Sequence, residues 1–287
     1  MLKLTEILPR EETMPKARMH GVNIYYEMTG EGFPMVWSHE FAGDYRSWEA
    51  QVRFFGRRYK VVTYNDRGYP PSDVPTEPDA YSVENSVEDL YQLLCHLKIE
   101  QAYVAGLSMG GGVALNFAIA HPEMVRALAI AGTGSGTVSR EEWEKAAIES
   151  ARLLETQGMA PVLETYAQRP NRISLQRKDP RGWQDFCYQF LHHSGLGSAL
   201  TTRGVQLKRR TIFELEPRLK ALEVPTLIMV GDEDQPCLEP ALFMKQTIPH
   251  SGLVVFPRSG HAINLEDPDA FNQAVLDFLT HVETGRW

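Results

Sequence analysis

Cysteine is scarce in this chain, with three cysteines among 287 residues. Cys95, Cys187 and Cys237 lie far apart, so the sequence has neither a CxxC pair nor the ligand spacing of a zinc site. A sparse, odd set of cysteines is typical of a reducing compartment, where thiols stay free. We therefore expect structural cysteines, no disulfide framework and no metal centre.

Long apolar runs are missing as well. Nowhere do 18 apolar residues follow one another, so no membrane span is expected, and the polar N-terminal sequence lacks the apolar segment of a signal peptide. Hydrophobic residues still make up 43% of the chain, enough for a full core. We predict a cytoplasmic protein in which residues 1–18 form a polar N-terminal extension.

Basic residues are too few for a general nucleic-acid binder. The chain has 29 Lys and Arg against 37 Asp and Glu, a net charge of −8, whereas phosphate backbones select basic surfaces. There is no P-loop, and the glycine-rich segment Gly132–Gly136 lacks the full G-x-G-x-x-G pattern. The sequence therefore indicates a small-molecule substrate and no cofactor, and it leaves open a homo-oligomer.

What the sequence does contain is a regular alternation of strand and helix patterns. Val22–Met28 alternates apolar and polar residues like an antiparallel strand, and Pro34–His39 and Lys60–Asn65 are short apolar runs typical of strands buried on both faces. Ser82–Ile99 has helical spacing, with Ser82 as cap. This alternation predicts an α/β fold with a mainly parallel sheet, whose active site lies at the carboxyl ends of the strands.

Strand patterns disappear between residues 139 and 216. This block reads as helices and carries 12 Lys and Arg against 10 Asp and Glu, while the remainder of the chain is acidic. Strand and helix patterns resume after it, from Pro225 to a last helix over about 268–282. We therefore expect a helical insertion that interrupts one α/β body formed by residues 19–138 and 217–287.

The segment Gly106-Leu107-Ser108-Met109-Gly110 is the strongest chemical signal. It fits G-x-S-x-G and stands directly between a predicted strand and a predicted helix. Such a turn strains the serine backbone and lifts the hydroxyl clear of the sheet, while the helix N-terminus supplies N–H groups for a developing negative charge. Ser108 is therefore a candidate nucleophile.

A serine nucleophile needs a base, and the base needs an orienting acid. Met229–Asp234 ends a predicted strand with three carboxylates, and Ser259–His261 follows the next strand. Because the carboxyl ends of parallel strands meet at one edge of a sheet, both segments are expected near Ser108. His261 is the candidate base, and the acid is one of the three carboxylates.

With these residues in view, the chain resembles the α/β-hydrolases, in the serine branch that includes 3-oxoadipate enol-lactonases, small esterases and cofactor-free haloperoxidases. The resemblance rests on four segments, namely GLSMGG (106–111), YNDRGYPPSD (64–73), VPTLIMVGDED (224–234) and SGHAINLEDPDAF (259–271). It covers the chain from about Met19 to the end. It implies an α/β-hydrolase fold in which residues 139–216 take the place of the family's helical cap.

The resemblance also implies roles for individual residues. Ser108 would be the nucleophile and His261 the general base and acid. The family's acid comes three residues after the strand-ending glycine, which here is Asp234, with Asp232 as the competitor. The other family position for the acid, at residues 133–136, holds no carboxylate, which favours Asp234.

The turn after the first buried strand departs from the family pattern. It commonly reads His-Gly-x-x-Gly, and here it reads His39-Glu40-Phe41-Ala42-Gly43. The resemblance implies that the Phe41 and Met109 backbone N–H groups form the oxyanion hole, with His39 and Glu40 beside it. A carboxylate aimed into that hole would repel the charge to be stabilised. We therefore predict that Glu40 points away and pairs with a cation or with backbone; the alternative is a direct role, such as positioning water.

These features predict a serine hydrolase that cleaves a small carboxylic ester or lactone through an acyl-enzyme on Ser108. The alternatives are a C–C bond hydrolase and a cofactor-free perhydrolase or haloperoxidase, which use similar residues. A non-enzymatic alternative is a ligand receptor on the same fold. Basic residues near the end of the helical block could bind a substrate carboxylate and would then favour an enol-lactonase, namely Arg203, Lys208, Arg209 and Arg210. The alternative, which we favour, is a solvated run of charges.

Overall fold

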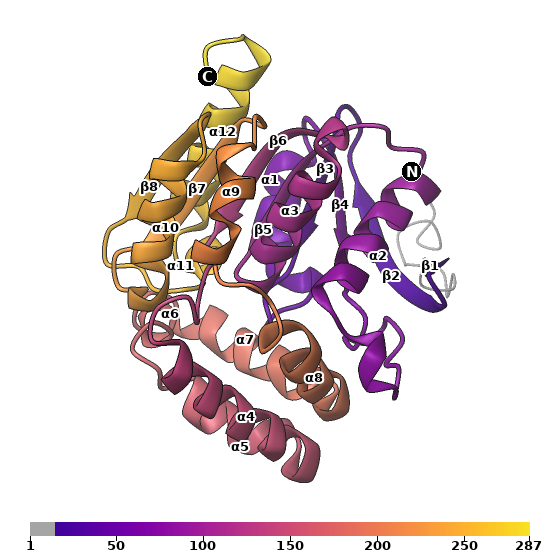
Figure 1. Cartoon of the computed structure of the whole chain (residues 1–287), viewed down its shortest axis with the longest axis vertical. Coiled ribbons are helices and arrows are strands. Elements are labelled where there is room, and N and C mark those ends of the chain that lie inside the picture. The colour runs from indigo at the N-terminus through magenta and orange to yellow at the C-terminus, as the bar shows by residue number, and fades with distance from the viewer. Residues whose placement is uncertain (1–14) are drawn as a thin grey trace, which may run out of the picture.

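The computed structural model describes residues 15–287 and contains one eight-stranded sheet in the order β1-β2-β4-β3-β5-β6-β7-β8 (Figure 1). The strands are β1 (Lys16–Met19), β2 (Val22–Thr29), β3 (Pro34–Ser38), β4 (Lys60–Tyr64), β5 (Ala102–Leu107), β6 (Val125–Ala131), β7 (Thr226–Gly231) and β8 (Ser251–Phe256). The strands β1 and β2 run antiparallel to their neighbours, and all the others are parallel. The predicted mainly parallel sheet is therefore confirmed.

The predicted N-terminal extension, residues 1–18, overlaps the first strand of the sheet. Residues 1–14 lie outside the described residues, but Lys16–Met19 forms β1 and pairs with β2 from Lys16↔Tyr25 to Met19↔Val22. Ala17 and Met19 are buried in the core cluster that β2 also joins. The sheet thus begins about three residues before the expected boundary at residue 18, because alternate residues of this short segment are apolar enough to cover the sheet edge.

The central strands are buried on both faces because each of them presents apolar side chains to two helical layers. In β3, Val36 joins one core cluster, whereas Met35 and Trp37 join the other, as the period of two along a strand requires. The first layer contains α2 (Val83–His96), α3 (Met109–Ala120) and α10 (Gln235–Thr247). The second contains α1 (Glu49–Phe55) and α12 (Pro268–Glu283).

Two helix ends show how local sequence sets the element bounds. The Ser82 side chain accepts the Asn85 N–H and caps α2, as its sequence predicts. The helix α3 ends at Ala120, two residues before Pro122. Pro122 explains the stop, because the residue before a proline is disfavoured in helical conformation.

Residues 139–216 form helices that gather at the carboxyl edge of the sheet, in the lower part of Figure 1. They are α4 (Arg140–Gln157), α5 (Met159–Tyr166), α6 (Ile173–Lys178), α7 (Pro180–Leu191) and α8 (Gly195–Thr201), followed by a π-helical turn over Thr202–Gln206. The short helices α9 (Glu216–Lys220) and α11 (Ile263–Glu266) belong to the adjoining α/β layers. We refer to residues 139–216 as the cap.

The cap is packed around its own apolar cluster, which also takes in a core segment. Trp183, Phe186 and Phe190 of α7 form its centre, and Ala42 from the turn after β3 lies in the same cluster. Cap and sheet therefore share buried surface at the turn where an oxyanion hole is expected. Among the helices of residues 15–287, none has the length and apolar character that crossing a bilayer would demand.

Candidate active site

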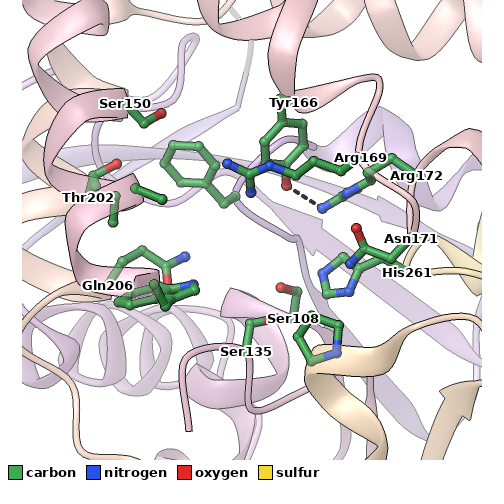
Figure 2. A pocket seen from close by; sticks show the side chains of 15 residues that line it. Ser108, Ser135, Ser150, Tyr166, Arg169, Asn171, Arg172, Thr202, Gln206 and His261 are labelled. Carbon is green, nitrogen blue, oxygen red and sulfur yellow. Dashed lines mark hydrogen bonds between the residues drawn. The ribbon is translucent and has the colours of Figure 1, made fainter. Parts of the chain in front are cut away.

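Ser108 occupies a strained turn between β5 and α3. Its backbone has φ +56° and ψ −110°, a conformation that L-residues rarely adopt. Strain of this kind persists where the surrounding structure fixes it, and it clusters at functional sites. The turn directs the Ser108 side chain into a cavity at the carboxyl edge of the sheet (Figure 2).

The glycines on either side of Ser108 are required by close packing. A Cβ on Gly106 would collide with the carbonyl of Gly110, and a Cβ on Gly110 would collide with the carbonyl of Ser38 at the end of β3. The start of α3 therefore touches the end of β3. This contact brings the turn after β3 next to Ser108.

Asp234 and His261 meet at the same edge. The Nδ1 of His261 lies 2.7 Å from Oδ2 of Asp234, and both side chains are buried. Burial by itself raises the pKa of the Asp234 carboxyl, but His261 and Asn171 outweigh it and hold that pKa below its ordinary value. Asp234 is thus an ionised hydrogen-bond partner for the imidazole at neutral pH, whereas Asp232 bonds the Ser259 N–H instead.

A cap residue holds this pair in place. Asn171 donates from Nδ2 to the other Asp234 oxygen at 2.8 Å, and its carbonyl accepts the His261 backbone N–H at 2.7 Å. A Cβ on Gly260 would collide with the same carbonyl. The loop between α5 and α6 is therefore locked to both partners of the Asp234–His261 bond.

The turn after β3 is fixed by a neutral histidine. Burial lowers the pKa of His39 to about 4, so its imidazole carries no charge at pH 7. Its Nε2 accepts the Asp66 N–H at 3.0 Å, which leaves Nδ1 to donate to the Glu40 carbonyl at 2.8 Å. The Glu40 carbonyl also accepts the Gly43 N–H at 3.1 Å. His39 thus holds the shape of the turn.

Two backbone N–H groups near Ser108 are free for a ligand. The Phe41 N–H has no acceptor among residues 15–287, and the Phe41 carbonyl is tied down by the Tyr69 hydroxyl at 2.9 Å. Met109 is the first residue of α3, so its N–H has no partner within the helix. Phe41 lines the same cavity as Ser108, and Met109 follows Ser108 in the chain, while the oxyanion hole itself stays a prediction.

Glu40 is completely buried and lies between a cation and the imidazole. The Arg172 guanidinium binds both of its carboxylate oxygens, with 2.8 Å between Nη1 and Oε1. Burial alone would raise the pKa of Glu40, but Arg172, aided by His261, holds it below its ordinary value. The expected cation is therefore Arg172. The side chain does not turn away from the site, however, because Oε2 lies 4.0 Å from His261 Nε2.

Ser108 and His261 line a cavity of about 290 Å³ between cap and sheet (Figure 2). Among residues 15–287, no hydrogen bond joins the two side chains. Aromatic and small residues form most of the wall, with Phe41, Trp143 and Tyr166 the largest. The cap also contributes polar side chains to the wall, namely Ser150, Arg169, Asn171, Arg172, Thr202 and Gln206. The cavity thus combines an apolar lining with a few convergent polar groups, as small-molecule sites do.

The cap residues of the site carry no sequence signal. Asn171, Arg172 and Gln206 belong to no motif, and only their position in the cap could have suggested a role. The basic residues that the sequence offered do not line the cavity. Arg203 pairs with Glu155, and Arg209 donates to the Ser135 carbonyl at 2.5 Å.

One group of side chains within residues 15–287 has the proximity of a metal site. Ligand atoms of Asp234, Cys237 and His261 lie within 4.8 Å of one another. Asp234 and His261 are already bonded to each other, and the Cys237 thiol donates to the Gly132 carbonyl at 3.2 Å. Burial raises the pKa of Cys237 well above its ordinary value, and a protonated thiol is a poor ligand. This cluster is therefore poorly suited to a metal.

Comparison with known proteins shows similarity over most of the chain. The family described as alpha/beta hydrolase fold matches residues 34–268. A relative, 3-oxoadipate enol-lactonase 2 of Acinetobacter baylyi, is 28% identical over 242 residues, or 84% of this chain and 86% of that protein. A 2-hydroxy-6-oxo-6-phenylhexa-2,4-dienoate hydrolase of Burkholderia cepacia is 25% identical over 94% of this chain and 95% of its own length.

Among solved structures, a thermophilic esterase from Thermogutta terrifontis superposes with a TM-score of 0.85. It is 28% identical, and the match covers 93% of this chain and 99% of the esterase. These similarities extend over cap and sheet alike, so they concern the whole molecule rather than one motif.

Proposed function

Because the chain belongs to the α/β-hydrolase family, we propose that it is a serine hydrolase that cleaves a small carboxylic ester or lactone through an acyl-enzyme on Ser108. The observation that carries the proposal is the buried Asp234–His261 bond of 2.7 Å, with His261 and Ser108 lining one cavity. Similarity to an enol-lactonase and to an esterase supports the same bond type.

Each step of this acyl-enzyme mechanism can be assigned to a residue of the site. His261 Nε2 takes the Ser108 proton as Oγ attacks the substrate carbonyl, and Asp234 holds the imidazole through Nδ1. The Phe41 and Met109 N–H groups bind the oxyanion, and loss of one such donor typically costs about 3 kcal/mol of transition-state stabilisation. His261 returns the proton to the leaving alcohol and next activates a water that releases the acid. Catalytic hydrogen bonds often tighten only when substrate is bound, so an open Ser108–His261 pair fits this cycle.

The cavity restricts the substrate. A volume of about 290 Å³ admits a small ester or lactone. The Gln206 side chain is buried in the cap wall, and its Oε1 has no partner among the described residues. A substrate group that donates a hydrogen bond to Gln206 would remove the cost of that unpaired oxygen. The cytoplasmic location and a homo-oligomeric state stay predictions.

The test is Ser108→Ala. Hydrolysis of a nitrophenyl ester should fall by about 10⁴-fold or more, since the variant has no nucleophile to acylate. A fluorophosphonate probe should label the wild-type protein at Ser108 and leave the variant unlabelled. Turnover by the variant at the wild-type rate would refute the assignment. Rapid labelling of the wild type without turnover of any ester or lactone would favour a ligand receptor.

C–C bond hydrolysis is the second candidate. The similarity to a 2-hydroxy-6-oxo-6-phenylhexa-2,4-dienoate hydrolase over 94% of this chain favours it. Assay of a vinylogous 1,5-diketone beside a nitrophenyl ester would separate the two, because a C–C hydrolase would turn over the diketone with the higher kcat/KM.

A further inference from the structure

The imidazole of His261 faces carboxylates on two sides. Asp234 bonds Nδ1 at 2.7 Å, and Glu40 Oε2 lies 4.0 Å from Nε2. In the proposed cycle, Nε2 is the atom that gains and returns the proton, so the second carboxylate lies on the side where positive charge develops. Glu40 is only 1% exposed, and water screens its charge little.

A cap cation opposes this second carboxylate. Arg172 forms a two-pronged ion pair with Glu40 and also donates to the Tyr166 hydroxyl. Its side chain is 4% exposed. Burying both charges of such a pair costs desolvation free energy, so the pair contributes little to the stability of the fold. Its position beside His261 suggests an electrostatic role.

We propose that Glu40 and Arg172 form a charge pair that sets the proton affinity of His261, with Glu40 stabilising the imidazolium and Arg172 limiting that effect. The inference rests on the proposed function, because it concerns the base of that reaction. Glu40 and Arg172 act through His261 and are positioning residues. No atom is transferred to either of them, since the proton moves only between Ser108, His261, substrate and water.

The other charged or titratable groups near His261 come from three regions of residues 15–287. They are Asp234 and Cys237 from the segment after β7, Tyr166 and Arg169 from the cap, and the buried Glu266 of α11, which accepts the Gly260 and Ala262 N–H groups. Asp234 is held by Asn171, and the Cys237 thiol is protonated. Arg169 is an exposed residue whose guanidinium lies 4.7 Å from the centre of the Tyr166 ring. These groups remain in place when Glu40 or Arg172 is replaced, so their contribution is common to all the variants below.

The signs predicted for the two partners are opposite. Protonation of the base abolishes activity on the acidic side of a kcat/KM profile. In Glu40→Gln the imidazolium loses an attractive charge and faces Arg172 alone, so the midpoint of the acidic limb should fall by about one pH unit or more. In Arg172→Gln the Glu40 carboxylate is no longer opposed, and burial drives it to compete with His261 for a proton. Asp234 at Nδ1 favours the proton on the imidazole, so Glu40 stays ionised beside the imidazolium and the midpoint should rise by about one unit.

The experiment measures kcat/KM for nitrophenyl acetate against pH for the wild type, both single variants and E40Q/R172Q. The double variant removes both charges, so its midpoint should return to within about half a unit of the wild type. Equal midpoints in all four proteins, with only the plateau lowered, would overturn the inference and make the pair purely structural. Shifts of the same sign in both single variants would also overturn it.

Glu40→Asp guards against loss of folding in the single variants. It keeps the negative charge and a partner for Arg172 but draws the carboxylate back by one methylene from His261. The midpoint should fall by about half a unit. An unchanged midpoint in a folded Glu40→Asp protein would count against the proposal. Ser108→Ala separates this failure from failure of the proposed function, because only the latter leaves ester turnover in that variant.

Discussion

At the scale of single residues, the choice of acid is the sharpest question. Asp234 bonds His261, whereas Asp232, two positions earlier, accepts the Ser259 backbone N–H at 3.2 Å. The two carboxylates lie in the same loop but bond different partners. They therefore form a matched pair of positions for testing which carboxylate orients His261.

Asp234→Asn should reduce kcat/KM for a nitrophenyl ester by about 10³- to 10⁴-fold, because an amide facing Nδ1 favours the wrong imidazole tautomer. Asp232→Asn keeps an oxygen acceptor for Ser259 and should leave kcat/KM about unchanged. Steady-state kinetics and thermal melting of both variants provide the comparison. Equal losses in the two variants would remove Asp234 from its proposed role.

At the scale of elements, the position of α3 decides whether Ser108 and the turn after β3 can cooperate. Gly110 lets the helix rest on the carbonyl of Ser38, the last residue of β3. Gly112 lies two residues further along α3. A Cβ added to Gly112 would point into open space, with no atom within 4 Å. Gly110 thus makes the close approach to β3 and Gly111 a close approach to the Thr133 side chain, whereas Gly112 makes none, so glycine content alone does not set the packing.

Gly110→Ala should destabilise the fold by about 3 kcal/mol, because the new Cβ overlaps backbone that cannot rotate away. Gly112→Ala in the same helix should be neutral or stabilise it by about 0.5–1 kcal/mol, since alanine is the better helix former. Urea unfolding of the two variants measures both free energies. Similar unfolding free energies for the pair would mean that the contact with β3 does not constrain α3.

At the scale of the whole molecule, cap and sheet are joined through the site itself. Asn171 bonds Asp234 and His261, Arg172 binds Glu40, and Ala42 packs in the cap's apolar cluster. A cap tied in this way is part of the site and not a separate lid. The same edge also buries titratable groups, so the stability of the whole fold depends on pH.

Asp66 is the clearest case. Burial, together with the nearby Asp89, raises the pKa of its carboxyl to about 7, and Oδ1 has no partner among residues 15–287. At a pH below the ordinary pKa of an aspartate, the Asp66 carboxyl is protonated in the folded and in the unfolded protein, so it does not lower the free energy of unfolding. As the pH rises, the unfolded chain loses this proton first, so stability falls until the folded carboxyl ionises near pH 7.

Asp66→Asn removes this ionisation. The variant should gain unfolding free energy relative to the wild type, and the gain should be larger near pH 8 than near pH 5 by on the order of 2–3 kcal/mol. Urea titrations at the two pH values test this. A gain that does not change with pH would mean that the Asp66 carboxyl is not held protonated in the folded protein.

The sequence by itself determined the features that depend on local pattern. Apolar runs and helical spacing predicted β3, β4, β5 and α2, and the G-x-S-x-G turn placed Ser108 between β5 and α3. Strand ends also placed the Asp234 and His261 segments at one edge, because parallel strands share their carboxyl edge. These inferences need only neighbours along the chain and the rules of a parallel sheet.

Only the tertiary structure decided which cap residues enter the site. Arg172 meets Glu40 across 132 positions, and Asn171 meets Asp234 across 63. Cap helices carry no motif, so no spacing in the sequence could identify these partners or exclude the basic residues from Arg203 to Arg210. The direction of Glu40 was decided in the same way, because a buried carboxylate turns toward whichever cation the fold brings to it. Here that cation comes from the cap and holds the carboxylate beside the imidazole.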